Sequence, residues 1–200
     1  HTNFELIIVD DCSTDTTREI VKSYTDERIK YYHNEQNRKI VYTLNRALSL
    51  ARGKYCARID ADDIMLPSRL EEQVAFLEGN LGYSLVDSVQ DCINERGEKI
   101  GRYNSYIIDE SEIVKTMPKT NCLGHPSIMV RSDILNEYQY RSIVYEDYDL
   151  WLRMLNDGKK IFKLGHPLTL FRVHDLSLTG TAQVNNKHFL NIAKTKLFYF

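Results

Sequence analysis

The stretch Phe4-Glu5-Leu6-Ile7-Ile8-Val9-Asp10-Asp11 (FELIIVDD) decides the fold class that this sequence predicts. Its apolar residues form an unbroken, partly β-branched run and do not alternate with polar residues. Such a run is typical of a strand that is covered on both faces, as in a parallel sheet. Two carboxylates follow at its end, and the carboxyl ends of strands are where open α/β sheets bind their ligands.

Strand and helix patterns alternate through residues 4–78. Thr16 and Glu19 have the spacing of a capping box, which predicts a helix from Thr16 to about Tyr24. Further elements are expected as strands at 28–33 and 55–59, and as helices over 40–51, which Gly53 would end, and from Pro67 onward. This order predicts an α/β fold with right-handed crossovers and a mostly parallel sheet flanked by helices.

The second half of the sequence is less regular. Strands are expected at 84–92, 99–103, 125–130, 161–164 and 168–173, with a turn at 94–97. A helix is expected over 147–157, with Trp151 facing the core and Gly158 ending the helix. The tail from 183 to 200 is expected to form another helix. No internal repeat or linker interrupts the sequence, so a single domain is expected.

The totals exclude several classes of protein. The 200 residues are 42% hydrophobic, which is enough to bury the core of one domain. A net charge of −2 without a basic run argues against a nucleic-acid-binding surface. The apolar runs are far shorter than the ~20 residues of a membrane span, and no secretory signal is visible. The four cysteines form no CxxC pair, which favours reduced thiols in a cytosolic protein over a disulfide frame or a zinc site.

Three acidic clusters follow apolar stretches: Asp10-Asp11, Asp60-Ala61-Asp62-Asp63 and Glu146-Asp147. Acidic residues after strands also cap helices and stabilise turns, and for Asp10-Asp11 alone that interpretation stays open. The cluster at 60–63 is harder to explain in that way, because carboxylates this close repel one another unless a cation or strong donors balance them. Oxygen ligands suit a hard divalent ion, so the cluster predicts a Mg²⁺ or Mn²⁺ site with open positions for substrate phosphates.

Five motifs, taken together, resemble the family 2 glycosyltransferases with the GT-A fold in their order and spacing. They are FELIIVDDCSTD (4–15), NRALSLARGKYCARIDADDIMLPSRLEEQVAFLE (45–78), HPSIMVR (125–131), YEDYDLWLRM (145–154) and LFRVHDLSLT (170–179). The resemblance extends to about residue 180 and implies a Rossmann-like GT-A sheet. It divides one catalytic domain (1–200) into a nucleotide-sugar-binding part at about 1–95, a less regular acceptor and catalytic-base part at about 96–180, and a C-terminal helix at 181–200.

The resemblance also implies what the sequence lacks. Members of the family open with another strand, which ends in a nucleotide-binding turn, and with a helix, before a strand like FELIIVDD. That segment is absent from this sequence, which begins at His1. An N-terminally truncated catalytic domain is therefore expected.

Carried over residue by residue, the resemblance implies roles for the donor side of the site. Asp11 would accept a hydrogen bond from the base of the donor nucleotide, with Asp10 supporting the loop, and an acceptor-only carboxylate favours uracil or thymine over cytosine. Asp62 would be the most direct metal ligand, and Asp60 would contact the ribose or a water on the metal. Asp63 would lie near the donor sugar.

The remaining implied roles concern the diphosphate and the acceptor. Asp147 would be the catalytic base, with Glu146 supporting it or binding the acceptor. His174 would close over the diphosphate or reach the metal, and Arg172 would offset phosphate charge, although a structural role is equally open for both. Arg38 is assigned to the nucleotide-sugar site.

Some residues depart from the family pattern. Cys12 and Lys39 stand where the family usually has glycine, so Cys12 either accepts backbone strain or the need for a positive φ is weak here. Lys39 would meet phosphate or solvent. His125 would line the acceptor side or be a hydrogen-bonded core histidine. These alternatives stay open at the level of sequence.

The expected function is inverting, metal-dependent transfer of a sugar from a nucleotide-diphosphate sugar, preferably UDP-linked, to a hydroxyl acceptor in cell-surface polysaccharide synthesis. The acceptor would be a saccharide or a lipid-linked saccharide, the cofactor Mn²⁺ or Mg²⁺, and the location the cytoplasm or the inner face of the membrane. Peripheral membrane association and a homodimer are compatible with this function, and nucleic acid is not an expected partner.

Two alternatives belong to other classes. A nucleotidyltransferase that makes nucleotide sugars should carry a Gly-rich phosphate loop with Lys or Arg near its N-terminus, and none is seen in the sequence. A non-catalytic nucleotide- or metal-binding module would have no need of a base such as the one that Glu146-Asp147 offers.

Overall fold

The computed structural model describes residues 1–103 and 107–174 of the chain. The strands are β1 (Leu6–Asp10), β2 (Ile29–His33), β3 (Tyr55–Ala57), β4 (Ile64–Met65), β5 (Tyr83–Ile93), β6 (Lys99–Tyr103), β7 (Met129–Arg131) and β8 (Lys160–Arg172). The helices are α1 (Thr17–Ser23), α2 (Lys39–Leu50), α3 (Arg69–Gly79), α4 (Glu110–Thr116), α5 (Ser132–Glu137) and α6 (Glu146–Asn156), with a 3-10 turn at His125–Ser127. The helix expected in the tail lies outside the described residues.

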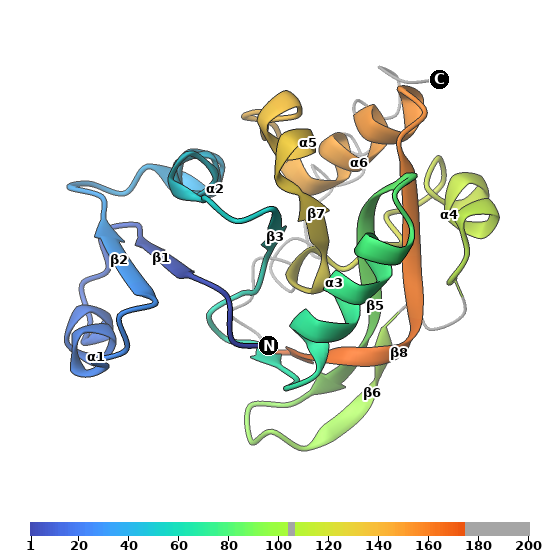
Figure 1. Cartoon of the computed structure of the whole chain (residues 1–200). Helices are drawn as coiled ribbons and strands as arrows, with labels where there is room; N and C mark the ends of the chain where they lie inside the picture. The colour runs from blue at the N-terminus through green and yellow to red at the C-terminus, as the bar shows by residue number, and fades with distance from the viewer. Residues whose placement is uncertain (104–106, 175–200) are drawn as a thin grey trace.

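The strands form two sheets (Figure 1). β1 and β2 pair in parallel in one sheet, and the other has the order β3-β7-β5-β8-β4, with β6 paired to β5. The α/β class is confirmed, but the prediction of a mostly parallel sheet is wrong for the larger sheet. Only β5 and β8 are parallel there, and the other pairings are antiparallel. β6 follows β5 through a short turn and pairs with it antiparallel, whereas the parallel neighbours β5 and β8 are connected by a long segment that contains α4, α5 and α6.

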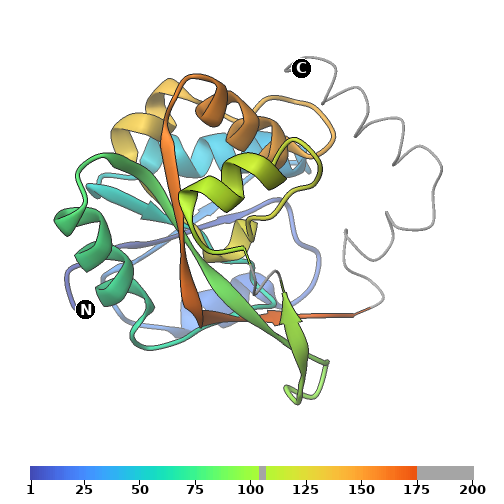
Figure 2. The ribbon, with the colours of Figure 1, turned by 90° about the vertical axis from the view of Figure 1, so that its right-hand side faces the viewer.

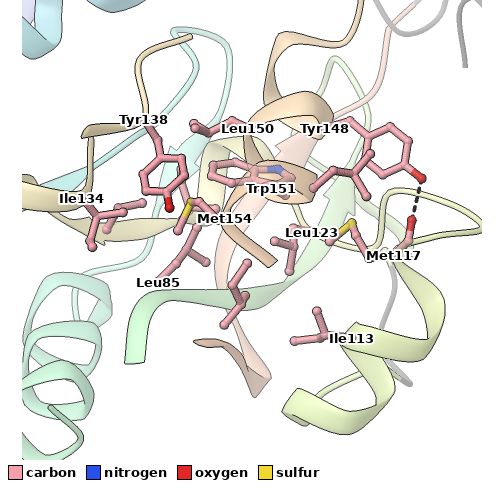
Figure 3. Packing of buried hydrophobic residues seen from close by; sticks show 14 of the residues in the cluster. Leu85, Ile113, Met117, Leu123, Ile134, Tyr138, Tyr148, Leu150, Trp151 and Met154 are labelled. Atoms are coloured by element: carbon pink, nitrogen blue, oxygen red, sulfur yellow. Dashed lines mark hydrogen bonds between the residues drawn. The ribbon is translucent and has the colours of Figure 1, made fainter. Parts of the chain in front are cut away.

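Successive residues of the central strands point to opposite faces of the larger sheet, as strand geometry requires. Leu85 packs in the cluster beneath α4, α5 and α6, whereas Val86 packs against α3 on the other face. The same division separates Ile161 from Phe162. Helices therefore cover both faces of this sheet, and the larger core lies on the α6 side (Figures 2 and 3).

Trp151 lies at the centre of that core and is fully buried, which confirms its predicted place (Figure 3). Gly158, at φ 72°, ends α6 as expected, because a left-handed residue suits glycine. The four cysteines are free thiols, in agreement with the prediction.

Several local predictions were wrong. The Thr16 side chain makes no capping bond, so the capping box is not formed. α2 ends at Leu50, three residues before Gly53, and α3 begins two residues after Pro67. The strands expected at 161–164 and 168–173 are one strand, β8, which passes through Gly165 and Pro167 with register shifts against β5. The strand expected at 125–130 is divided into the 3-10 turn and β7.

β1 and β3 each have one edge that pairs with no strand among the described residues. In Figure 1 these two strands flank the same region below α2. The four apolar residues of β1 are exposed or only partly buried. The unpaired edge of the smaller sheet, β1, and the unpaired edge of the larger sheet, β3, thus border the same region.

Candidate active site

Asp60, Asp62 and Asp63 lie in the turn between β3 and β4. One oxygen of each carboxylate lies within 4.8 Å of the others. The guanidinium of Arg58 binds both oxygens of Asp60, with Nη1 2.9 Å from Oδ2. His174 Nε2 lies 2.9 Å from Asp62 Oδ2. The structure therefore brings the predicted ligands together and supplies two of them with a positive or donor partner.

Asp63 is the most enclosed carboxylate of this cluster. It accepts a hydrogen bond at Oδ1 from the backbone N–H of Arg172 at 2.7 Å, while Oδ2 is buried without a hydrogen-bond partner among the described residues. Burial, reinforced by the charges of Asp60 and Asp62 and opposed by the Arg172 N–H, raises the pKa of Asp63 to about 6. A partnerless buried oxygen beside two carboxylates fits a hard cation with oxygen ligands, such as Mg²⁺ or Mn²⁺.

Arg172 binds the chain around the cluster and does not point into it as an unpaired charge. Its Nε donates to the carbonyl of Asp62 at 2.8 Å, and its Nη1 donates to the carbonyls of Asn94 at 2.8 Å and Glu95 at 3.2 Å. Arg172 thereby ties the end of β8 to the acidic turn and to the β5–β6 turn. This geometry supports the structural alternative over contact with phosphate.

An open pocket of about 340 Å³ adjoins the cluster at His174. It is lined by Asn94, Glu95, Arg96, Glu98, Val173 and His174. His174 thus stands between the carboxylate cluster and a polar depression that a ligand can enter.

Glu146 and Asp147 form the first turn of α6. Asp147 Oδ2 accepts a hydrogen bond from Asn121 Nδ2 at 3.0 Å. Burial raises the pKa of Asp147, and burial together with the nearby charge of Asp147 raises the pKa of Glu146. Tyr145, directly before them, has φ 63°, a conformation that costs a non-glycine residue energy and is found preferentially at functional sites.

Arg58 is a site residue that the sequence-based reasoning missed. Besides binding Asp60, its charge acts on Glu146 and Asp147 and opposes the rise of their pKa values. Arg58 lies at the turn that carries Asp60, and its charge acts on Glu146 and Asp147. It therefore connects the two acidic clusters electrostatically. A charged residue inside the run Tyr55-Cys56-Ala57-Arg58-Ile59, two positions before Asp60 and on the same side of the strand, is the signal that could have found it.

Asp10 and Asp11 lie on the smaller sheet, at the end of β1. Asp10 is buried and accepts hydrogen bonds from the Ser13 N–H at 2.8 Å and the Tyr31 hydroxyl at 2.5 Å, with His33 Nδ1 at 3.3 Å. Burial alone would raise the pKa of Asp10, but these hydrogen bonds outweigh it and hold the pKa well below its usual value. Asp10 therefore binds Ser13 in the following loop and Tyr31 on β2, and its support of a nucleotide-binding loop stays a prediction.

Asp11 joins β1 to the start of α2. Its oxygens accept hydrogen bonds from Asn34 Nδ2 at 2.7 Å and from the backbone N–H groups of Arg38 at 2.7 Å and Lys39 at 2.8 Å. The Arg38 guanidinium lies over the Tyr42 ring at 4.4 Å. Asp10, Asp11 and Arg38 are thus grouped with β1, β2 and α2, apart from the residues around Asp60.

Two further backbone outliers flank Asp11. Cys12 has φ 66° and Lys39 has φ 69°, both in the left-handed region that favours glycine. Both positions therefore require a positive φ, and the chain accepts the strain. All three non-glycine residues with positive φ in the described chain adjoin a predicted site residue.

His125 lies on the core side of the site. Its Nε2 is 2.8 Å from the Tyr140 hydroxyl, and its ring meets the edge of Trp151 with the centroids 5.9 Å apart. Burial lowers the pKa of His125 well below its usual value, so the ring is neutral. This environment is that of a hydrogen-bonded core histidine.

The α/β fold, with an acidic turn after β3 and an acidic pair at the start of α6, belongs to the GT-A class. The fold is similar to that of S. aureus TarS in complex with UDP-GlcNAc, with a TM-score of 0.75 and 19% identity over 99% of this chain and 58% of that one. It is also similar to the mannosyltransferase PcManGT from Pyrobaculum calidifontis in complex with GDP-Man and Mn²⁺, with a TM-score of 0.68 and 15% identity over 97% of this chain and 55% of that one.

The family model described as "Glycosyl transferase family 2" matches residues 1–139, and the chain belongs to this family. It is 37% identical to the putative glycosyltransferase EpsE of Bacillus subtilis over 83% of this chain and 61% of EpsE. It is 35% identical to the O-antigen biosynthesis glycosyltransferase WbnJ of Escherichia coli over 91% of this chain and 73% of WbnJ.

A further relative is the UDP-Glc:alpha-D-GlcNAc-diphosphoundecaprenol beta-1,3-glucosyltransferase WfgD of Escherichia coli. Identity is 30% over 79% of this chain and 60% of WfgD. The chain thus spans less than two thirds of the length of EpsE and WfgD. Among the described residues, no helix is long and apolar enough to cross a membrane.

Proposed function

We propose that this chain is the catalytic part of an inverting, metal-dependent glycosyltransferase that moves a sugar from a nucleotide-diphosphate sugar to a hydroxyl group. The observation that carries the proposal is the pair of acidic clusters that the charge of Arg58 links. Three carboxylates lie within 4.8 Å of one another in one cluster. The second, at the start of α6, is linked to the first through the charge of Arg58.

The first cluster suits the leaving diphosphate. Asp62 and Asp60 would hold Mn²⁺ or Mg²⁺, with Asp63 and His174 beside them. When bound, such an ion neutralises the negative charge that develops on the diphosphate as it departs. Arg58 offsets part of the charge of the Asp60 carboxylate in the absence of the ion. The structural similarity to PcManGT, which was solved with GDP-Man and Mn²⁺, supports a divalent metal as the cofactor.

The second cluster suits the attacking hydroxyl. Asp147 would take the proton from the acceptor, since burial raises its pKa toward the range in which a carboxylate is an effective base. Asn121 fixes the orientation of the carboxylate. Attack from the side opposite the diphosphate is a single displacement, so the configuration at the anomeric carbon inverts.

The relatives suggest the substrates. TarS was solved with UDP-GlcNAc, and WfgD is named for transfer from UDP-Glc to a sugar on diphosphoundecaprenol. We infer a UDP-linked donor and a saccharide or lipid-linked saccharide acceptor, at the cytoplasmic face of a membrane. Peripheral membrane association and a homodimer remain predictions.

The proposed division of the domain follows the two sheets. The β1–β2 sheet with Asp10, Asp11 and Arg38 would bind the nucleotide, together with the acidic turn, and the part from about 96 to 180 would bind the acceptor and carry the base. The unpaired edges of β1 and β3 support a further strand between them. We propose that the full protein supplies this strand, and a helix, from a segment outside these 200 residues.

The experiment measures UDP binding by calorimetry and sugar transfer from a panel of nucleotide sugars, with the full-length protein. In the Asp62→Ala variant we expect the same UDP affinity with and without Mn²⁺, because the most direct ligand of the metal is lost. Asp147→Asn should retain donor binding within about twofold and lose transfer by at least about a hundredfold, since an amide cannot accept the proton. Equal UDP affinity with and without Mn²⁺ in the parent protein, or full turnover by Asp147→Asn, would contradict the proposal.

A further inference from the structure

Asp87 and Lys163 form an ion pair inside the larger sheet. They are neighbours in the parallel pairing of β5 and β8, and both side chains are fully buried. Lys163 Nζ lies 3.2 Å from Asp87 Oδ2. Two buried charges are costly to desolvate, and a well-packed apolar pair often replaces them without loss of stability. The groups that this pair binds therefore indicate its role.

Both charges bind one loop, residues 121–127. Asp87 accepts hydrogen bonds from the backbone N–H of Gly124 at 3.0 Å and from the hydroxyl of Ser127. Lys163 Nζ donates to the carbonyl of Cys122 at 2.9 Å. The ion pair thus satisfies one N–H, one hydroxyl and one carbonyl of loop 121–127 deep in the protein, where water cannot replace them.

Loop 121–127 in turn touches α6 at two points. Asn121, next to Cys122, donates to Asp147 Oδ2 at 3.0 Å. His125 packs against the edge of Trp151, with the ring centroids 5.9 Å apart. Figure 3 shows Trp151 and Leu123 in the same packed cluster. A displacement of the loop would therefore move the amide that orients Asp147.

The far end of the loop has its own anchors. Arg69 donates to the carbonyl of Pro126 at 2.7 Å, and Gln73 Nε2 donates to the carbonyl of Ser127 at 2.7 Å. The bond from Lys163 to Cys122 is adjacent to Asn121 in the chain and holds the end of the loop that reaches Asp147. Removing the ion pair therefore releases the Asn121 end of the loop, while the other end stays attached.

We propose that Asp87 and Lys163 are positioning residues for Asp147, and that they act through loop 121–127 and Asn121. The inference rests on the proposed function, in which Asp147 is the base. It assigns to a buried ion pair outside the donor cluster the orientation of the carboxylate that receives the proton. The pair is expected to affect the chemical step and not the binding of donor or metal.

The test is a double-mutant cycle in the full-length protein. One change is the pair Asp87→Asn with Lys163→Met, which removes both charges together and leaves no unpaired buried ion. The other is Asn121→Ala. Each is expected to lower kcat at least tenfold while the KM for the nucleotide sugar and the affinity for Mn²⁺ stay within twofold. Combined, they should lower kcat no further than the larger single effect, because both interrupt the same path.

The matched control is Asp91→Asn with Arg102→Met. It changes another ion-paired carboxylate of β5. Arg102 Nε lies 2.7 Å from Asp91 Oδ1 and Lys99 Nζ lies 2.6 Å from Asp91 Oδ2, and neither ion pair involves loop 121–127. Its kcat is expected to stay within twofold of the parent. Equal loss in the control, or losses that multiply in the combined variant, would overturn the proposal.

A second measurement does not depend on activity. Trp151 is the only tryptophan of the 200 residues, and it packs against His125 of the loop. Quenching of its fluorescence by acrylamide is expected to rise at least twofold when Asp87 and Lys163 are replaced. If quenching rises but the parent protein transfers no sugar, the proposed function is wrong and the attachment of the loop stands. If the parent transfers sugar and the replaced pair changes neither kcat nor quenching, the positioning role is wrong.

Discussion

The Asp63 carboxyl illustrates how single residues hold the acidic turn together before any cation binds. Asp60 is paired with Arg58, Asp62 lies beside His174, and Asp63 has one backbone N–H and one buried oxygen without a partner among the described residues. Asp63 is therefore the carboxylate of the cluster whose negative charge is least compensated, and its pKa is raised to about 6.

This raised pKa predicts how stability depends on pH in the metal-free protein. Asp63 binds its proton more tightly when folded than when unfolded, so the free energy of unfolding falls as pH rises from about 4, the pKa in the unfolded chain, to about 6. Asp63→Asn stays neutral and should lose this dependence. Relative to the parent, the variant should gain about 2 kcal/mol between pH 4 and pH 7, after allowance for partial exposure.

Urea unfolding at a series of pH values, with a chelator present, measures the effect. Mn²⁺ should reverse this difference in stability between the variant and the parent. The cation stabilises the ionised carboxylates of the parent, and it stabilises the variant less because the variant has one carboxylate fewer. Parallel pH curves for parent and variant would show that Asp63 is not the titrating group.

The sequence could predict the acidic residues of the site but not their partners. The acidic residues stand in clusters, and such clusters are noticeable in a sequence because closely spaced carboxylates repel one another. They are Asp60, Asp62, Asp63, Glu146 and Asp147. Asn121 has no such signal, since its contact with Asp147 depends on how loop 121–127 is anchored to the sheet. The sequence left the role of Arg172 open for a similar reason, because the carbonyls that it binds come from a distant turn.

At the scale of elements, the start of α2 combines a functional contact with backbone strain. Lys39 has φ 69°, and its backbone N–H donates to Asp11 at 2.8 Å. A left-handed conformation costs an ordinary residue about 1–2 kcal/mol, whereas glycine adopts it freely. The side chain of Lys39 is therefore incidental to the bond with Asp11.

Lys39→Gly is expected to raise the free energy of unfolding by about 1 kcal/mol, because the strain is relieved and the backbone bond to Asp11 is kept. Thermal or urea unfolding measures the change. Lys39→Ala is the matched control, since alanine removes the side chain but retains the strain, and it should give no gain. A gain in alanine equal to that in glycine would assign the effect to the lysine charge.

The elements themselves were predictable where hydrophobic period and length agree. β1, α2, β6 and α6 fall within one or two residues of their expected positions. β8 was divided in the prediction because Gly165 and Pro167 usually interrupt a strand. Its partner β5 accommodates them by shifts of register, which are a property of the sheet and not of either segment alone.

At the scale of the whole molecule, the unpaired edges of β1 and β3 can be assigned to particular amides. Leu6 N–H donates to Arg28 at 2.8 Å, and the carbonyl of Asp10 accepts from Asn34 at 2.8 Å, so the residues of β1 between them that face away from β2 are Ile7 and Val9. On β3, the carbonyl of Lys54 accepts from Ser132 and the N–H of Arg58 donates to Ile128. Tyr55 and Ala57 therefore face away from β7.

The proposed strand between β1 and β3 would bind these outward amides. Hydrogen exchange at Ile7, Val9, Tyr55 and Ala57 is expected to be at least about a hundredfold slower in the full-length protein than in residues 1–200 alone. Ile8, which faces β2, serves as the internal control and should differ less between the two. Equally fast exchange at the four outward amides in both proteins would mean that no strand fills this place.

The arrangement of the larger sheet has a consequence for biosynthesis. β8 lies between β5 and β4, so this sheet is complete only when residue 172 has left the ribosome. α2 is made well before β8, and its partly buried Val41, Leu44 and Leu48 pack against the core on the α6 side. At about 5–20 residues per second, this face of α2 waits roughly 6–25 s until residue 172 is synthesised. The apolar face of α2 is thus exposed on the growing chain for that time, and nascent-chain chaperones would find a binding site there.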